Sequence, residues 1–263
     1  MTEQPKKTPS DKQFSRLRMY NAGMGVLHLV QGIAMIILSS DFSLPITTLY
    51  LQFDPKTTTL GQNLNTIGEL PIGPMVAVFL FISALAHFFV STVGFTTYKN
   101  DLKENLNRAR WYEYSASSSV MIVIIAMLTG VYDLSSLILI FFVNAAMILF
   151  GMDMEKYNNL GKGADWTPFI YGTIMGLIPW VVIGLYLFGT ETTAGTSVPN
   201  FVYGIFGSIF VFFNVFAINM VLQYKKVGRW SDYLYGERVY VILSLFAKSA
   251  LAWQVFAGTL RPM

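Results

Sequence analysis

The sequence contains no cysteine and only two histidines. The first absence excludes disulfide bonds and thiolate metal sites, and two histidines are too few for a histidine-rich metal centre. Charged residues are also scarce, at 13% of the 263 residues, whereas a soluble domain typically has about 25%. No phosphate-binding glycine loop, zinc-protease motif or serine-triad motif is present, so a hydrolase or a nucleotide-driven transporter has little support.

Hydrophobic residues are abundant instead, at 54% of the chain, and the mean hydropathy is +0.50. Seven apolar runs of about 20 residues are long enough to cross a bilayer. Because they lack strand alternation, and because backbone groups in lipid need internal partners, each is predicted to be a helix. The predicted spans are residues 19–39, 71–95, 111–130, 134–151, 168–189, 200–224 and 239–260. The predicted fold class is therefore an all-α membrane protein, a bundle of seven transmembrane helices.

Lysine and arginine predict the orientation of this bundle. Fifteen of the 18 lie in segments on one side of the predicted spans, whereas only Lys56 and Arg261 lie on the other side. Because positive residues accumulate in cytoplasmic segments, we expect a cytoplasmic N-terminus and an extracellular C-terminus in the cell membrane. The predicted organisation is a polar, basic cytoplasmic segment over residues 1–18 and one seven-helix domain over residues 19–260.

The longest predicted connection, residues 40–70, lies on the external side. Two stretches that flank Asp54 and Pro55 have the composition of short strands. They can pair as a small hairpin, and an irregular loop is an equally open alternative.

Lys248 is the single charged residue in the last predicted span, and the nine residues before it are uncharged. A lysine near the bilayer centre costs about 2.5 kcal/mol or more. Snorkelling to the interface relieves this cost near helix ends but poorly at the centre. We therefore expect Lys248 to be paired with a carboxylate or modified as a Schiff base.

Glu113 is the only acidic residue within the seven predicted spans, which makes it the candidate partner of Lys248. The predicted boundaries place Glu113 near the cytoplasmic end, whereas Lys248 lies about 14 Å along its own helix at 1.5 Å per residue. An interfacial Glu113 paired with Arg110 or Arg108 is therefore an equal alternative. Glu155, just after the fourth span, is expected to be a solvated charge at the rim.

Serines lie close to both candidate residues in the sequence. Ser244 precedes Lys248 by one helical turn, and Ser117 follows Glu113 by one turn, with Ser118 beside it. Their hydroxyls can hydrogen-bond a protonated nitrogen or a carboxylate. The alternative is bonding to a helix carbonyl or close helix packing.

Two histidines, His28 and His87, fall inside the first and second spans, and Ser83 precedes His87 by four residues. An intramembrane histidine suits proton exchange, although a histidine bonded across helices is an equal reading. Asn144 in the fourth span has the same ambiguity. Trp253 lies five residues from Lys248, near enough to flank anything attached there.

Two segments resemble heliorhodopsins, a family of retinal proteins. They are SLFAKSALAWQ at residues 244–254 and RARWYEY at residues 108–114. The resemblance extends along essentially the whole chain, including the long first external loop and the cytoplasmic N-terminus. The fold it implies is the same seven-helix bundle.

The resemblance implies a role for each candidate residue. Lys248 is expected to hold all-trans retinal as a Schiff base, with Glu113 as its counterion and Ser244 as its hydroxyl neighbour. Trp253 is expected to pack against the polyene, and Asn144 to lie near the retinal. The cluster expected to accept the proton consists of His28, His87 and Ser83, with Ser117 or Ser118.

These residues predict a light-sensing photoreceptor, not an enzyme, whose shape change acts on an unknown cytoplasmic signalling partner without net ion pumping. The reason is that one intramembrane carboxylate is present and no second is seen on the far side, so a complete proton pathway is missing. The resemblance also implies a homodimer in the lipid bilayer, and nothing points to nucleic acid. The alternatives are a light-driven ion transporter or channel, and a chromophore-free membrane regulator.

Overall fold

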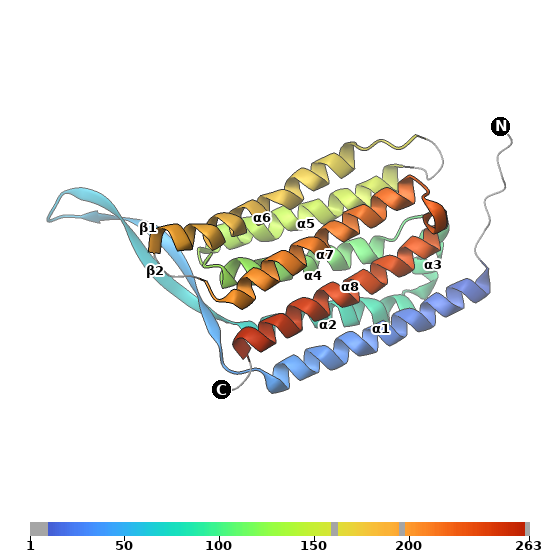
Figure 1. The fold of residues 1–263 in the computed structure, drawn as a ribbon, viewed down its shortest axis with the longest axis horizontal. Coiled ribbons are helices and arrows are strands. Elements are labelled where there is room, and N and C mark those ends of the chain that lie inside the picture. Colours follow the sequence, from blue (N-terminus) through green and yellow to red (C-terminus); the bar gives the residue numbers. More distant parts are fainter. Residues whose placement is uncertain (1–9, 159–162, 195–197, 261–263) are drawn as a thin grey trace.

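The structure, a computed structural model, describes residues 10–158, 163–194 and 198–260. Within these ranges seven helices are long and apolar enough to cross a membrane. They are α1 (Asp11–Leu38), α2 (Ile72–Ser91), α4 (Arg108–Leu128), α5 (Leu134–Tyr157), α6 (Thr167–Ala194), α7 (Asn200–Tyr224) and α8 (Tyr233–Val255). They lie side by side along the long axis of the molecule (Figure 1). The predicted seven-helix membrane fold is confirmed.

Shorter elements complete the bundle. The helix α3 (Phe95–Lys103) follows α2, a 3-10 turn η1 (Gly228–Ser231) precedes α8, and a π turn η2 (Phe256–Leu260) continues it. The helix α3 lies at the end of the bundle where α1, α4 and α8 begin, and it brings Asp101, Lys103 and its C-cap Glu104 to this end. We call this end, which carries most of the lysines and arginines, the charged end.

The helices α1 and α8 begin well before their apolar runs predict. Asp11 starts α1, eight residues before position 19. Ser10 and Gln13 form a capping box at this start. Tyr233 starts α8, six residues before position 239, because the Asp232 carboxylate accepts a 3.0 Å bond from the Leu234 amide. Because capping residues determine where these helices begin, polar residues that a hydropathy window leaves outside the span are helical.

The loop that is predicted to be external forms a two-stranded antiparallel hairpin, the first of its two alternatives. Strand β1 (Ser43–Asp54) pairs with β2 (Thr59–Pro71), and the register places Asp54 opposite Thr59. The hairpin projects from the end opposite the charged end (Figure 1). A 2.8 Å bond from the Thr47 amide to the Tyr132 carbonyl ties its base to the connection between α4 and α5.

The interior of the bundle differs between its two halves. A large apolar cluster fills the half nearer the hairpin, with contributions from α2, α4, α7 and α8. The buried charged residues lie in the other half, from Lys248 towards the charged end. They include Asp101, Arg110, Glu155 and Glu237. A functional site is therefore expected on the polar side of Lys248.

Candidate functional site

Lys248 and Glu113 form a buried ion pair in the middle of the bundle. The Lys248 Nζ lies 2.8 Å from the Glu113 Oε1 and 2.8 Å from the Ser244 Oγ. Glu113 also accepts a 2.6 Å bond from the Ser83 hydroxyl. Lys248 is 3% exposed and Glu113 9%, so neither charge is solvated. Of the two partners that the sequence leaves open for Glu113, the structure has Lys248.

The sequence predicts that Glu113 and Lys248 lie at different depths along the bundle. The stagger of α4 against α8 and the direction of the Lys248 side chain remove this difference. α4 begins level with the second turn of α8, because Arg110 is paired with Glu237 and the Tyr114 hydroxyl donates to the Tyr240 carbonyl at 2.8 Å. Helical side chains lean towards the N-terminus of their helix. Lys248 does so, which is why its Nζ reaches the Ser244 hydroxyl one turn back.

Lys248 lines a cavity of about 130 Å³, whose other lining residues come from α4, α5, α6, α7 and α8. Its lining is almost wholly apolar and rich in aromatic and methionine side chains: Trp111, Tyr114, Phe169, Phe213, Phe216, Tyr240, Met121, Met147 and Met220. An amine beside a cavity of this kind suits a long apolar ligand with a carbonyl end. The residues present therefore fit retinal attached at Lys248.

Some of the predicted site residues line this cavity and others do not. Ser117, Ser118 and Ser244 line it. Asn144 does not, but its amide donates to the Ser118 hydroxyl at 2.8 Å, so it supports the lining from behind. Trp253 lies outside the lining, is 40% exposed and donates a 3.1 Å bond to Gln31. The indole of Trp253 is therefore directed towards Gln31 on α1, and its contact with a bound ligand stays a prediction.

The two histidines stack on each other beside the ion pair. Their ring centroids lie 5.5 Å apart with planes 9° from parallel. The His87 Nδ1 lies 2.8 Å from the Asn21 Oδ1, whereas neither His28 nitrogen has a hydrogen-bond partner among the described residues. Ser83, one turn before His87 on α2, binds Glu113. The predicted polar cluster is therefore assembled next to the carboxylate.

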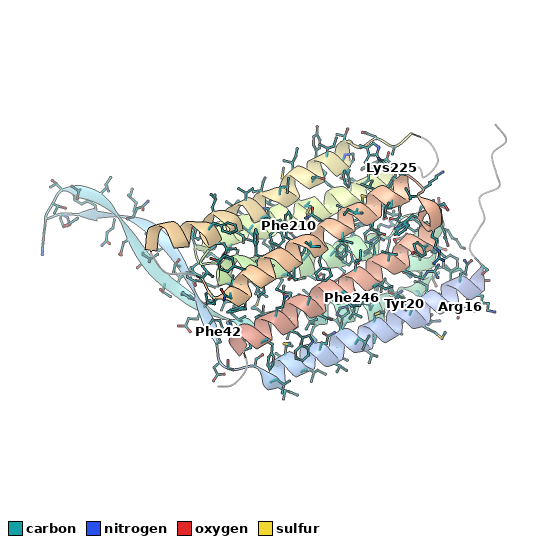
Figure 2. The ribbon with its side chains drawn as sticks, viewed as in Figure 1. Arg16, Tyr20, Phe42, Phe210, Lys225 and Phe246 are labelled. Carbon is teal, nitrogen blue, oxygen red and sulfur yellow. The ribbon has the colours of Figure 1, made fainter. Side chains whose placement is uncertain are left out.

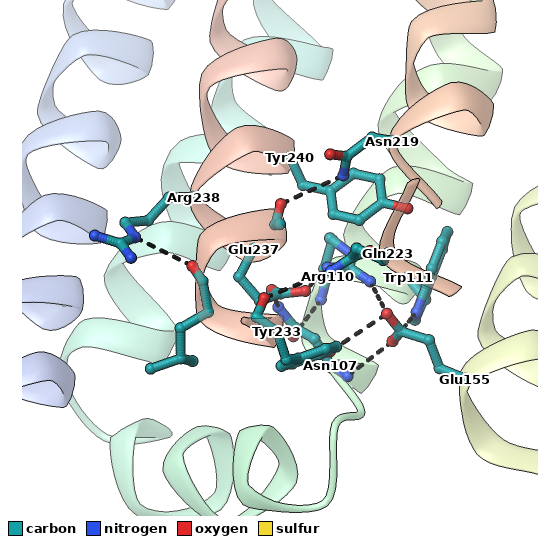
Figure 3. A network of polar contacts seen from close by, with 12 residues as sticks. Asn107, Arg110, Trp111, Glu155, Asn219, Gln223, Tyr233, Glu237, Arg238 and Tyr240 are labelled. Carbon is teal, nitrogen blue, oxygen red and sulfur yellow. Dashed lines mark hydrogen bonds and ion pairs between the residues drawn. The ribbon is translucent and has the colours of Figure 1, made fainter. Parts of the chain in front are cut away.

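A second group of buried charges lies between the cavity and the charged end (Figure 3). Arg110 forms ion pairs with Glu155 and Glu237, and all three side chains are at most 4% exposed. The Asn107 amide donates to Glu237 at 2.7 Å. The Trp111 indole donates to Glu155 at 2.6 Å. Because Trp111 also lines the cavity, one side chain connects the two sites.

The sequence reading missed this group. It treated Glu155 as a solvated rim charge, which is wrong, because residues 152–157 extend α5 and bury Glu155 against Arg110. It also began the last span at residue 239, after Glu237, which lies in the first turns of α8 and is fully buried. The available signal was the Asp at position 232, an N-cap residue that would have brought Glu237 into the helix.

The comparison with known families agrees with this geometry. The family model described as Heliorhodopsin matches residues 17–260, which include all seven long helices apart from the first six residues of α1. No curated protein matches the sequence.

Proposed function

The chain belongs to the heliorhodopsin family, whose members bind retinal as chromophore, and from this premise we propose that it is a light-sensing photoreceptor carrying all-trans retinal on the Lys248 Nζ. The observation that carries this proposal is the buried Lys248–Glu113 pair at the wall of an apolar cavity. When bound there, retinal supplies a light-driven isomerisation. The protein supplies attachment, electrostatics and the response.

Glu113 acts as the counterion in this proposal. Its carboxylate lies 2.8 Å from the Lys248 Nζ and stabilises a proton held on that nitrogen. The Ser83 hydroxyl donates to the same oxygen and keeps it in place. The Ser244 hydroxyl accepts from Nζ and orients it. When light moves Nζ away from Glu113, the stabilisation falls and the proton can leave towards the polar side.

The polar side offers a place for this proton. His28 and His87 lie on the same side of Lys248 as Ser83, and His28 has two unpartnered ring nitrogens within the described part of the chain. A neutral imidazole has one ring nitrogen with a lone pair that can accept a proton. We assign His28 and His87, with Ser83 and Ser117, the role of the proton-accepting cluster.

Among the residues that the structure describes, the opposite side has no buried carboxylate or histidine to take up a proton, and this supports a sensor over a pump. All four buried carboxylates of the described residues lie at Lys248 or nearer the charged end: Asp101, Glu113, Glu155 and Glu237. The half nearer the hairpin is packed with residues such as Met127, Ile205 and Val255. A pump needs groups that exchange protons on both sides. A proton released here returns from the side on which it left.

The signal is proposed to leave through the charged end. Trp111 touches the ligand cavity and Glu155 at once, so a change of cavity shape reaches the Arg110 group directly. Under the positive-inside rule this end is cytoplasmic, and an unidentified cytoplasmic partner binds it.

A homodimer is part of the proposal. One hairpin face carries Leu49, Leu51, Phe53, Leu60 and Leu64, all more than half exposed, as a surface that a second copy can cover.

An absorption spectrum of the protein expressed with all-trans retinal tests the central assignment, with Lys248→Ala as the matched variant. We expect a visible band in the wild type that hydroxylamine bleaches, and none in Lys248→Ala. A folded, retinal-supplied wild type without colour, or an unchanged band in Lys248→Ala, would refute the assignment.

Illuminated vesicles test the absence of pumping. We expect no sustained change of the external pH and no steady current under continuous light. A sustained light-driven gradient that a protonophore abolishes would replace the sensor by a transporter.

A further inference from the structure

A second hollow lies on the outside of the bundle, between α1 and α8. It has a volume of about 280 Å³ and lies at the charged end, where both helices begin. The side chains that line it are Gln13, Arg16, Leu17, Tyr20, Leu234 and Arg238. Leu17 and Leu234 are buried, so the hollow has an apolar base with two guanidinium groups beside it.

The two arginines are only weakly neutralised. Across the described ranges Arg16 forms no ion pair. Arg238 Nε donates to the Leu234 carbonyl at 3.1 Å, which fixes the direction of the guanidinium. Its Nη2 lies 3.8 Å from the Asp232 carboxylate, beyond hydrogen-bond distance, and both side chains are about half exposed. Two cations from different helices thus face one groove, an arrangement that favours a bidentate oxyanion such as phosphate.

The groove continues along the bundle as an apolar seam. Leu27 on α1 and Ile242 and Phe246 on α8 follow the groove residues at helical spacing, and each is 41–60% exposed. Figure 2 shows Arg16, Tyr20 and Phe246 following one another from the charged end towards the middle of the bundle. The seam ends where Trp253 donates to Gln31.

The seam is long enough to hold an acyl chain that spans one leaflet. From position 238 to position 253, α8 rises about 22 Å at 1.5 Å per residue. One leaflet contributes roughly 15 Å, half of a hydrocarbon core of about 30 Å. A free phosphate ion would use the arginines alone, whereas a lipid uses the arginines and the seam.

We propose that this groove binds the phosphate of an anionic phospholipid, with one acyl chain in the α1–α8 seam. Arg16 and Arg238 hold the phosphate, Tyr20 lies at the boundary between headgroup and hydrocarbon, and Leu27, Ile242 and Phe246 contact the chain. The orientation proposed above makes this a lipid of the cytoplasmic leaflet. The site shares no lining residue with the retinal cavity, so it stands independently of the photoreceptor proposal.

Native mass spectrometry of the purified protein, titrated with short-chain phosphatidylglycerol or phosphatidylcholine, tests the site. We expect the wild type to bind phosphatidylglycerol about 10-fold more tightly, and the Arg16→Gln/Arg238→Gln protein to lose this preference. Lys225→Gln removes one charge at the same end but outside the groove, and its affinity is expected to change less than about 2-fold. Should the double Gln variant fail to fold, Arg16→Met/Arg238→Met keeps the apolar stems and gives the same test.

Three results would overturn the proposal. An unchanged lipid preference in the double variant would show that the groove is not the site. An equal loss in Lys225→Gln would show diffuse attraction to the charged end. Displacement of the lipid by inorganic phosphate at equal concentration would assign the groove to a free anion. Because binding is measured without light or pigment, failure here and failure of the retinal assignment are distinguishable.

Discussion

At the residue scale, Glu113 is the side chain whose charge matters most to the candidate site. It contacts the Lys248 Nζ and the Ser83 hydroxyl, and it is buried. When one partner of such a buried pair is removed, the charge of the other partner is left uncompensated, because water does not reach it. The effect of Glu113 on the bound chromophore can therefore be isolated by removing the charge while keeping the shape.

Glu113→Gln makes that change. Because the carboxylate stabilises the proton on the Lys248 Nζ, we expect the visible band to move to longer wavelength and to disappear at a lower pH than in the wild type. A spectral titration of the purified pigment measures both. Glu104→Gln is the control, because Glu104 is exposed at the end of α3. A Glu113→Gln protein with the wild-type band and midpoint would remove the counterion role.

Arg110 gives the second prediction at this scale. Arg110→Met leaves Glu155 and Glu237 buried without a cation, and we expect a loss of about 3–5 kcal/mol in the free energy of unfolding. Adding Glu155→Gln and Glu237→Gln to the same protein removes the unpaired charges and should restore most of that loss. Chemical unfolding in detergent, followed by far-ultraviolet circular dichroism, gives the comparison.

Arg108 is the control for this prediction. Its side chain is 54% exposed in its ion pair with Asp101, so Arg108→Gln is expected to cost about 1 kcal/mol or less. If Arg110→Met were no more destabilising than Arg108→Gln, the buried group would not hold the charged end together.

At the element scale, the contact between α4 and α5 depends on a glycine. A Cβ at Gly151 would lie 2.5 Å from the Trp111 ring. That ring cannot retreat easily, because its indole nitrogen is bonded to Glu155 and the side chain is 4% exposed. The close approach of the two helices therefore sets the position of a residue that lines the cavity.

Gly151→Ala is expected to lower stability by about 1–3 kcal/mol through overpacking, and to shift the absorption band because Trp111 is displaced. Gly184→Ala on α6 is the matched control, since nothing lies within 4 Å of a Cβ there. Thermal unfolding and visible spectra of both variants decide. An unshifted, equally stable Gly151→Ala protein would mean that Trp111 is free to move.

At the whole-molecule scale, the two ends of the bundle differ in charge and in structure. The hairpin extends from one end, and α3 and most cationic residues lie at the other (Figure 1). The positive-inside rule assigns the charged end to the cytoplasm. This predicted orientation determines which compartment would receive the proposed signal.

The absence of cysteine makes the orientation directly testable. A single Asn63→Cys in the hairpin is expected to react with a membrane-impermeant maleimide in intact cells, whereas Lys225→Cys at the charged end should react only after lysis. Both positions are exposed, so accessibility within the protein does not limit either reaction. The reverse pattern would place the N-terminus outside the cell.

The sequence by itself determined the seven helices, because uninterrupted apolar runs in lipid have no alternative to internal backbone hydrogen bonding. It also identified Lys248 and Glu113 as the two unusual charged residues, since an isolated charge in an apolar span is costly. It could not decide between Lys248 and Arg110 as the partner of Glu113. That choice depends on the stagger of α4 against α8, which long-range contacts set.

Only the tertiary structure placed Trp253 outside the cavity and brought Arg110, Glu155 and Glu237 together. Hydropathy is averaged along the chain, so polar residues in the first or last turn of a helix are read as solvated flanks. Their burial depends on what other helices place beside them. The rotation of α8 about its axis, which turns Lys248 inwards and Trp253 outwards, is likewise fixed by packing against α1, α2 and α7.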